Sequence, residues 1–345
     1  MDRRYGSTKL LKTTIKQAYC WLAEVSRLPR ISRRSCVTVL AYHRIVSADP
    51  EQELCVSPDF FDSQVALLAS AFRIISLEEA VMRLGNGDLE SHYVALTFDD
   101  GWLDNYIHAF PILKKYAVPA TIFVTSDAIS SGRFSWYEFD DAILQTSATS
   151  IDLETYGLGR FPLRHSRLRS SAIHRLHDIL KNMKHSQRQE IVESVIRRYG
   201  RSVGSRIMLN WDELREMIAS GLVTVGGHTI SHPILTHVSA AEARREISGC
   251  KTVIEENLRR PVRFFAYPNG RPADINQQLV DLVRDAGYAA AFSMTAGPNY
   301  SLEERFRLRR TAISNGVCRG VTGVLSPSML ATRVRGALGG LPFSA

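Results

Sequence analysis

Short apolar runs without polar alternation are the feature that most limits how this chain can fold. Residues 37–42, 94–98 and 120–124 are almost entirely apolar, and stretches with helical periodicity separate them. A strand buried on both faces shows such a run, and strands that alternate with helices are typical of βαβ units in a parallel sheet. The chain therefore predicts an α/β fold in which helices cover a parallel sheet.

Length and composition narrow the class of protein further. The 345 residues suffice for two ordinary domains or one large barrel, and 45% hydrophobic residues indicate a globular chain. No apolar run approaches the ~18 residues of a membrane span, and charged residues interrupt the stretch where a signal peptide would lie. The five cysteines are dispersed, which favours a reducing compartment. We therefore expect a cytoplasmic protein.

Two adjacent carboxylates follow the apolar run 94–98. Asp99 and Asp100 stand at its C-terminal end, and Gly101 permits a sharp turn directly after them. Neighbouring residues on a strand point to opposite faces, so the two carboxylates can serve one site only if the backbone turns between them. One alternative is a strand-end turn in which an Asp caps the next helix. The other is a ligand site, because ligands of α/β folds gather where strands end.

Two histidines four residues apart form a second cluster. His228 and His232 follow the short apolar run 221–225, and spacing of four lets their ring nitrogens converge on one ion. With a carboxylate from the end of another strand they would complete a site of two imidazoles and one carboxylate, with room for water. Such ligands favour zinc, and cobalt or nickel fits the same set.

Three motifs together carry a family resemblance. Residues 97–101 (TFDDG), 228–232 (HTISH) and 265–270 (FAYPNG) resemble the first three motifs of the polysaccharide deacetylases, which are carbohydrate esterase family four with its NodB-homology domain. The motifs occur in the family's order, and the similarity extends from about residue 37 to about residue 314. The resemblance implies a distorted (β/α) barrel of about seven parallel strands with a helical insertion.

The resemblance also implies roles for individual residues. Asp99 corresponds to the general base, and the metal ligands are Asp100, His228 and His232. The backbone N–H of Tyr267 corresponds to the oxyanion donor, with Pro268 fixing its turn. In the branch that resembles the poly-N-acetylglucosamine deacetylases, a Tyr-His pair on the first strand places a histidine in the site, and this makes His43 the candidate general acid.

The sequence departs from the family pattern at two places. Phe264 stands where an arginine usually begins the third motif and pairs with the base, so Arg263 or Arg271 would have to replace it. The C-terminal Leu-x-His motif, which carries the acid histidine, is absent from residues 307–314. This absence favours His43 as the acid, with His237 as the second candidate.

We divide the chain into three parts. Residues 1–35 form a basic amphipathic segment whose helix, over 8–27, either packs on the barrel or lies on an anionic membrane surface. Residues 36–315 form the barrel, with a helical insertion at about 133–205, and 316–345 form a C-terminal tail. Nucleic acid is not an expected partner, because no aromatic platform accompanies the basic residues.

Within the barrel, smaller features receive specific expectations. Trp136 is a candidate for stacking on a sugar ring in a substrate groove. His174, His177 and Asp178 are expected to lie on a solvated helix face rather than to bind metal. Helix 239–257 has a capping box of Ser239 and Glu242, and Glu246 and Glu255 are expected on its solvated surface without a role.

The functional hypothesis is a metal-dependent hydrolase that removes acetyl groups from N-acetylated sugars. Its substrate would be an N-acetylglucosamine-containing exopolysaccharide or a lipid-linked precursor, the latter met at the inner face of the membrane. Two alternatives remain open: a glycan-binding barrel without activity, and a metal-dependent amidohydrolase for small cyclic amides. The pair of acids beside both histidines argues against the first, because a pure binder needs no free base.

Overall fold

The computed structural model describes residues 35–47, 54–200, 206–320 and 324–336, with positions 13, 14, 17, 18 and 20. Most of the helix expected over residues 8–27 lies outside these ranges. Cys20, which is described, is buried against Met329 near the other end of the chain. No helix of the described residues combines the length and apolarity needed to span a membrane.

A nearly closed barrel of seven parallel strands forms the centre of the described fold. The hydrogen-bonded order is β11 (Ala290–Phe292), β10 (Phe264–Ala266), β9 (Val223–Gly227), β6 (Ala120–Val124), β5 (His92–Phe98), β1 (Cys36–Tyr42) and β12 (Arg310–Ala312). A parallel bridge from Phe292 to Leu308, just before β12, brings the two ends of this order together. A short extra strand, β4 (Arg73–Ile74), pairs with β5. The predicted barrel class is therefore confirmed.

Both faces of the central strands are buried, as the unbroken apolar runs predict. In β1, Leu40 and Tyr42 belong to the large cluster beneath the helices, whereas Val37 and Val39 belong to a second cluster. That second cluster also holds Phe123 and Phe292, whose ring centroids lie 5.8 Å apart although their strands are not neighbours in the sheet. The second cluster therefore fills the inside of the barrel.

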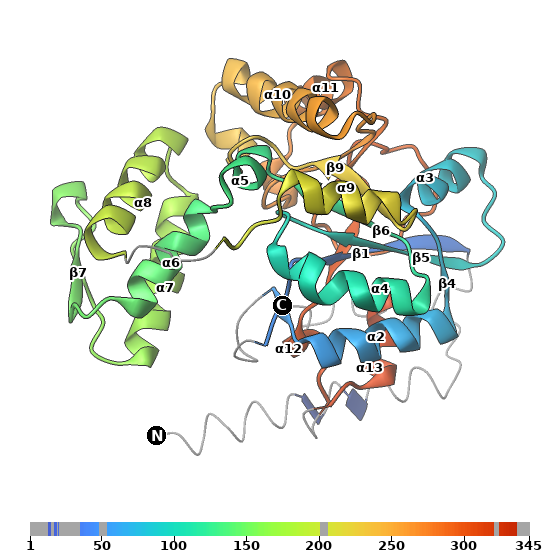
Figure 1. Cartoon of the computed structure of the whole chain (residues 1–345), viewed down its shortest axis with the longest axis horizontal. Helices are drawn as coiled ribbons and strands as arrows, with labels where there is room; N and C mark the ends of the chain where they lie inside the picture. Colours follow the sequence, from blue (N-terminus) through green and yellow to red (C-terminus); the bar gives the residue numbers. More distant parts are fainter. Residues whose placement is uncertain are drawn as a thin grey trace.

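Helices surround the barrel (Figure 1). Those between the strands are α2 (Pro58–Ala71), α3 (Leu77–Asn86), the π-helical turn Asn105–Ala109 with α4 (Phe110–Tyr116), α5 (Ser126–Ser131), α9 (Trp211–Ala219), α10 (Ala240–Leu258) and α11 (Gln277–Asp285). The expected capping box is present, because Ser239 accepts from the Glu242 N–H and the Glu242 carboxylate accepts from Ser239. Two short strands, β2 (Arg44–Ile45) and β3 (Cys55–Val56), pair beside the barrel.

A lobe with its own core extends from one side of the barrel, at the left of Figure 1. It contains α6 (Ser135–Gln145), β7 (Ser150–Asp152), β8 (Arg160–Pro162), α7 (Ser166–Lys181) and α8 (His185–Tyr199). The helices fall where the helical insertion was expected, but the antiparallel hairpin of β7 and β8 was not predicted. Strands of three residues are too short to show a period of two.

The C-terminal part of the chain, which we expected to be a tail from residue 316, contains two helices, α12 (Asn315–Cys318) and α13 (Pro327–Val334). The hydroxyl of Thr38 in β1 donates to the Val334 carbonyl at 2.7 Å, and both groups are buried. This contact ties α13 to the first strand of the barrel.

Gly226 offers a test of packing inside the barrel. A Cβ at this position would lie 2.5 Å from ring atoms of the buried Phe123 and 2.9 Å from the Phe264 carbonyl oxygen. We expect Gly226→Ala to lower the free energy of unfolding by about 1–3 kcal/mol, the usual cost of overpacking a core. Urea denaturation measures the change.

Gly85→Ala is the matched control for that substitution. Its Cβ would meet only the end of the Leu302 side chain, which can move. Equal stability of Gly226→Ala and Gly85→Ala would show that the barrel interior tolerates the extra methyl group.

Candidate functional site

The backbone turns between the two adjacent carboxylates. Strand β5 ends at Phe98, and Asp100 and Gly101 then adopt left-handed conformations, with φ of 72° and 89°. A Cβ on Gly101 would lie 2.6 Å from the Ile129 side chain, so this position has room for glycine alone. The turn lets Asp99 and Asp100, both buried, take part in one site.

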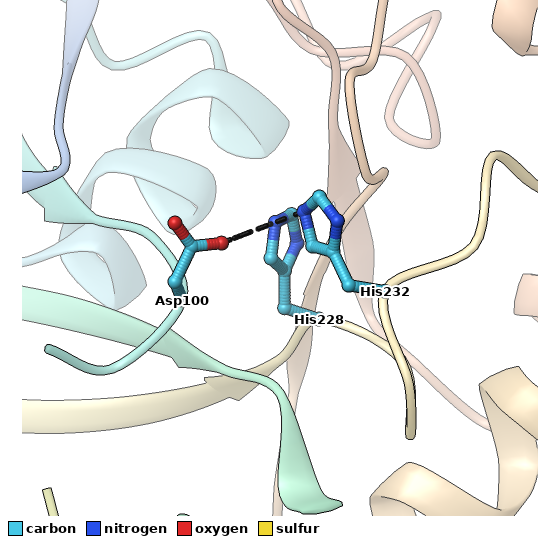
Figure 2. Close-up of side chains that lie close together, drawn as sticks. All are labelled: Asp100, His228 and His232. Atoms are coloured by element: carbon cyan, nitrogen blue, oxygen red, sulfur yellow. Dashed lines mark ion pairs between the residues drawn. The ribbon is translucent and has the colours of Figure 1, made fainter. Parts of the chain in front are cut away.

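Asp100, His228 and His232 converge at the C-terminal ends of β5 and β9 (Figure 2). Asp100 Oδ1 lies 3.6 Å from His228 Nε2 and 3.4 Å from His232 Nε2. The potential ligand atoms of the three residues all lie within 4.8 Å of one another. The expected group of two imidazoles and one carboxylate is therefore assembled as a candidate metal site.

Hydrogen bonds orient this triad toward a common point. Asp100 Oδ2 accepts from Trp102 Nε1 at 2.9 Å, whereas Oδ1 is buried and has no hydrogen-bond partner in the described residues. His228 Nδ1 lies 2.7 Å from the Ala266 carbonyl oxygen and must donate to it, which leaves the Nε2 lone pair free. An orphaned carboxylate oxygen beside two free imidazole nitrogens is the donor set that a divalent cation requires.

Burial favours the uncharged forms of these three groups. It lowers the pKa of His228 and of His232, and it raises the pKa of Asp100 to about 6. Neutral imidazole is the form that binds metals, so both histidines are ready as ligands at neutral pH.

A buried carboxylate holds the loop between the two histidines. Glu246 Oε2 accepts from the N–H groups of Ile230 and Ser231 at 2.8 and 2.9 Å, and Oε1 accepts from the Ser231 hydroxyl at 2.8 Å. Glu246 is 6% exposed, so the expectation of a solvated residue without a role is wrong. The helix period does not reveal this contact, because the partners belong to a loop of unpredicted shape.

The loop itself is conformationally unusual. Thr229 and His232 have positive φ, 68° and 59°, a region that β-branched residues and histidine seldom occupy. The Thr229 hydroxyl accepts from the His232 N–H at 3.0 Å. Together with Glu246, this bond maintains the conformation that turns His232 toward Asp100.

Arg310 in β12 is the partner of Asp99. Its Nη1 and Nη2 donate to Asp99 Oδ1 and Oδ2 at 2.6 and 2.8 Å, and its side chain is fully buried. Burial alone would raise the pKa of Asp99, but the charge of Arg310, helped by His228 and His43, holds that pKa well below its ordinary value. Asp99 is therefore ionised at neutral pH.

The two arginines proposed for this role lie elsewhere. Arg263 is exposed and pairs with Glu78 at the surface, and Arg271 is exposed at the start of a short 3₁₀ turn. Strand order explains why Arg310 is the arginine that pairs with Asp99, because β12 lies beside β1 and β1 lies beside β5. Arg310 thereby reaches Asp99 across 211 residues of sequence.

His43 stands directly after β1, beside the two acids. Its Nε2 lies 3.8 Å from Asp99 Oδ2, and its Nδ1 is buried without a hydrogen-bond partner in the described residues. Burial lowers the pKa of His43, while the charge of Asp99 opposes that effect. His237, the second candidate for the acid, lies in a short 3₁₀ turn and lines a separate hollow with Ser239 and His185.

The expected oxyanion donor is engaged in the sheet. The Tyr267 N–H donates to the Phe292 carbonyl at 3.1 Å, and its hydroxyl donates to the Phe306 carbonyl at 3.0 Å. Tyr267 thus acts as part of the core, and the expectation that its N–H serves a substrate is wrong. Pro268 follows in the buried turn after β10.

The lobe residues singled out from the sequence lie outside the triad. Trp136 is the second residue of α6 and is half-buried, with its ring centroid 5.0 Å from that of His177. His177 Nε2 bonds Asp140 at 2.7 Å, and His174 is exposed. Within the ranges described, the one group of three residues that could hold a metal ion is Asp100, His228 and His232, and neither His174 nor His177 belongs to it.

Comparisons with known proteins identify similar chains. The family model described as polysaccharide deacetylase matches residues 86–291, which is more than half of the chain. The Bacillus subtilis protein YxkH is 21% identical over 293 residues, covering 84% of this chain and 76% of that protein. The poly-beta-1,6-N-acetyl-D-glucosamine N-deacetylase of Staphylococcus epidermidis is 30% identical over 115 residues, covering 29% of this chain and 40% of that enzyme.

A solved structure shares the fold. The Streptococcus pyogenes deacetylase PplD, determined in complex with acetate, superposes with a TM-score of 0.56 at 21% identity. The match covers 84% of this chain and 96% of PplD.

Glu246 gives a prediction about metal affinity. We expect Glu246→Gln to weaken binding of a divalent cation about 10- to 100-fold, because one of three loop contacts loses its acceptor and the charge that strengthens all of them disappears. Competition with a chromophoric chelator measures the affinity.

Glu255→Gln is the matched control, since Glu255 lies on the same helix and contacts the Val262 N–H and Lys251 instead. Equal affinities in the two variants would contradict a positioning role for Glu246.

Proposed function

Because the chain belongs to the polysaccharide deacetylase family, we propose that it hydrolyses the N-acetyl group of a glycan containing N-acetylglucosamine. The observation that carries the proposal is that two adjacent carboxylates at the end of one strand have different partners. Asp100 faces the two histidines, and Asp99 forms an ion pair with Arg310. A cation site needs only the first carboxylate, whereas hydrolysis needs a second one as base.

Asp100, His228 and His232 are the residues that would hold the cation, and zinc is the ion that we propose. A divalent ion held there would lower the pKa of a water molecule and polarise the carbonyl of the amide. The neighbouring side chains then move the protons.

Asp99 is the proposed general base. Arg310 keeps it ionised, and the bidentate contact fixes the direction of its oxygens. Asp99 accepts a proton from the attacking water, so that the water oxygen can bond to the acetyl carbon.

His43 is the proposed general acid. Its Nε2 is 3.8 Å from Asp99, whose negative charge opposes the lowering of the His43 pKa by burial. Protonated His43 donates to the sugar nitrogen as the carbon–nitrogen bond breaks, and the products are acetate and a free amine.

The oxyanion donor that we propose is the backbone N–H of Asn269. The Tyr267 N–H is engaged, and Pro268 has none, so Asn269 provides the next donor in this turn. Its φ of 60° places it in a tight turn, and the Ala266 carbonyl at the start of the same segment contacts His228. No described acceptor bonds its N–H.

The substrate we propose is poly-N-acetylglucosamine or a lipid-linked precursor. Support comes from the similarity of one segment to the Staphylococcus epidermidis enzyme named for that polymer. Peripheral contact of the N-terminal segment with an anionic membrane stays a proposal that would suit the precursor.

Acetate release tests the function. We expect the zinc-loaded protein to release acetate from N-acetylglucosamine oligomers, measured by an enzyme-coupled assay. Asp99→Asn should abolish turnover with metal still bound, and His228→Ala should lose the metal, as checked by elemental analysis. Full activity of Asp99→Asn would refute the assigned base, and a metal-loaded protein without acetate release would favour another amide.

The pH profile tests the pairing of Asp99 with Arg310. Arg310 lowers the pKa of Asp99, so Arg310→Lys, which keeps the charge but loses the bidentate contact, should raise it. A raised pKa means that the base becomes protonated at higher pH. The acid limb of kcat/KM should therefore shift upward in Arg310→Lys and stay in place in Arg309→Lys, whose side chain is exposed. An unmoved acid limb in both variants would contradict Asp99 as the titrating base.

A further inference from the structure

A cavity of about 530 Å³ lies beside the candidate metal site, between α5, the start of α6, and α8 of the lobe. Its lining includes Phe134, Trp136, Arg188, Gln189 and Ser231. Two of these residues adjoin the triad: Ser231 directly precedes His232, and the Phe134 ring centroid is 5.4 Å from that of His232. A molecule that extends from the triad can therefore enter this cavity.

Arg188 gives the cavity an unusual charge. This residue is 2% exposed, yet no ion pair joins it to a carboxylate of the described residues, and burial is the only cause that shifts its pKa. Its Nη2 donates to His185 Nδ1 at 2.7 Å, and its guanidinium carbon lies 5.3 Å from the Trp136 ring centroid. Its Nη1 is buried and has no hydrogen-bond partner in the same part of the chain.

Such an arrangement is costly for an isolated protein. A buried charge without a partner loses several kcal/mol of hydration that neutral contacts do not restore. Burial accordingly lowers the pKa of Arg188 to about 10, which still leaves the guanidinium charged at neutral pH. A negatively charged ligand would remove the penalty.

The other charged residues of the lining do not serve as that partner. Arg133 and Glu138 neutralise each other, with contacts of 2.5 and 2.9 Å. Asp127 is exposed, and no charged neighbour contributes to the shift of its pKa, so it is not the partner of Arg188. Arg188 is thus the one charged residue of this lining whose charge is buried and unpaired.

We propose that the cavity is a subsite for an oxyanion carried by the substrate, either a phosphate ester or a carboxylate, bound by Arg188 beside Trp136. Guanidinium groups form their strongest hydrogen bonds with such oxyanions, and the indole face offers an apolar surface to the sugar that carries the group. That the oxyanion belongs to the substrate rests on the proposed deacetylase function. Binding of an anion in the cavity does not depend on that function.

Binding of two simple probes tests the subsite. Inorganic phosphate and glucuronate are titrated calorimetrically into the metal-loaded full chain, into Arg188→Gln and into Arg197→Gln. Arg197 is exposed on the same helix and provides the matched loss of charge. We expect at least one probe to bind about tenfold more weakly to Arg188→Gln alone. Equal binding to all three proteins would locate the anion on the metal and overturn the proposal.

A second variant keeps the proposal testable if Arg188→Gln fails to fold. Gln189 also lines the cavity and is only partly buried, so Gln189→Glu adds a negative charge without disturbing the buried guanidinium. It should weaken the same probe by a similar factor. Unchanged affinity in Gln189→Glu would also overturn the proposal.

Acetate release distinguishes the two sources of the oxyanion. We compare kcat/KM for N-acetylglucosamine oligomers that carry a phosphate ester, a uronic acid or neither. The preferred anionic oligomer should lose its advantage over the neutral one in Arg188→Gln. Probe binding that depends on Arg188 without any acetate release would refute the deacetylase function alone, whereas acetate release with anion binding indifferent to Arg188 would refute the subsite alone.

Discussion

The buried ion pair between Arg310 and Asp99 joins closure of the barrel to the chemistry of the site. Two charges removed from water repay their desolvation only when their geometry is good, and here two short parallel bonds provide it. That geometry exists only if β12 lies beside β1 and β1 beside β5. The guanidinium carbon also lies 5.2 Å from the Phe123 ring centroid inside the barrel. A shift in the register of these strands would therefore leave an unpaired charge buried in the core.

Backbone strain is concentrated at the same edge of the barrel. Asp100, Thr229 and His232 adopt left-handed conformations that cost of order 1–3 kcal/mol each. The surrounding bonds from Trp102, Glu246 and the Thr229 hydroxyl maintain them. The strands hold the turns in fixed positions, and the turns orient the side chains. Asp100, His228 and His232 therefore converge although they follow two different strands.

The sequence predicted the parts of this protein that depend on local pattern. Fully apolar runs identified the central strands, and the polar residues at their ends indicated a group of His228, His232 and one carboxylate. The family resemblance then selected Asp100 as that carboxylate, and the three side chains do lie together. Contacts between distant segments were not predictable in this way. Arg310 sits in a stretch where charged and apolar residues alternate, which indicates an edge strand and conceals an inward-facing arginine. Glu246 and the Tyr267 N–H find their partners only once loop shape and strand register are known.

The separate core of the lobe has a consequence for how such a protein can diversify. Helices α6, α7 and α8 bury their apolar side chains mainly against one another and the hairpin, so the lobe can be remodelled without repacking the barrel. Yet residues of the lobe line the cavity that also contains Ser231, the neighbour of His232 in the candidate metal site. A change confined to the lobe can thus alter the wall of this cavity and leave Asp100, His228 and His232 in place.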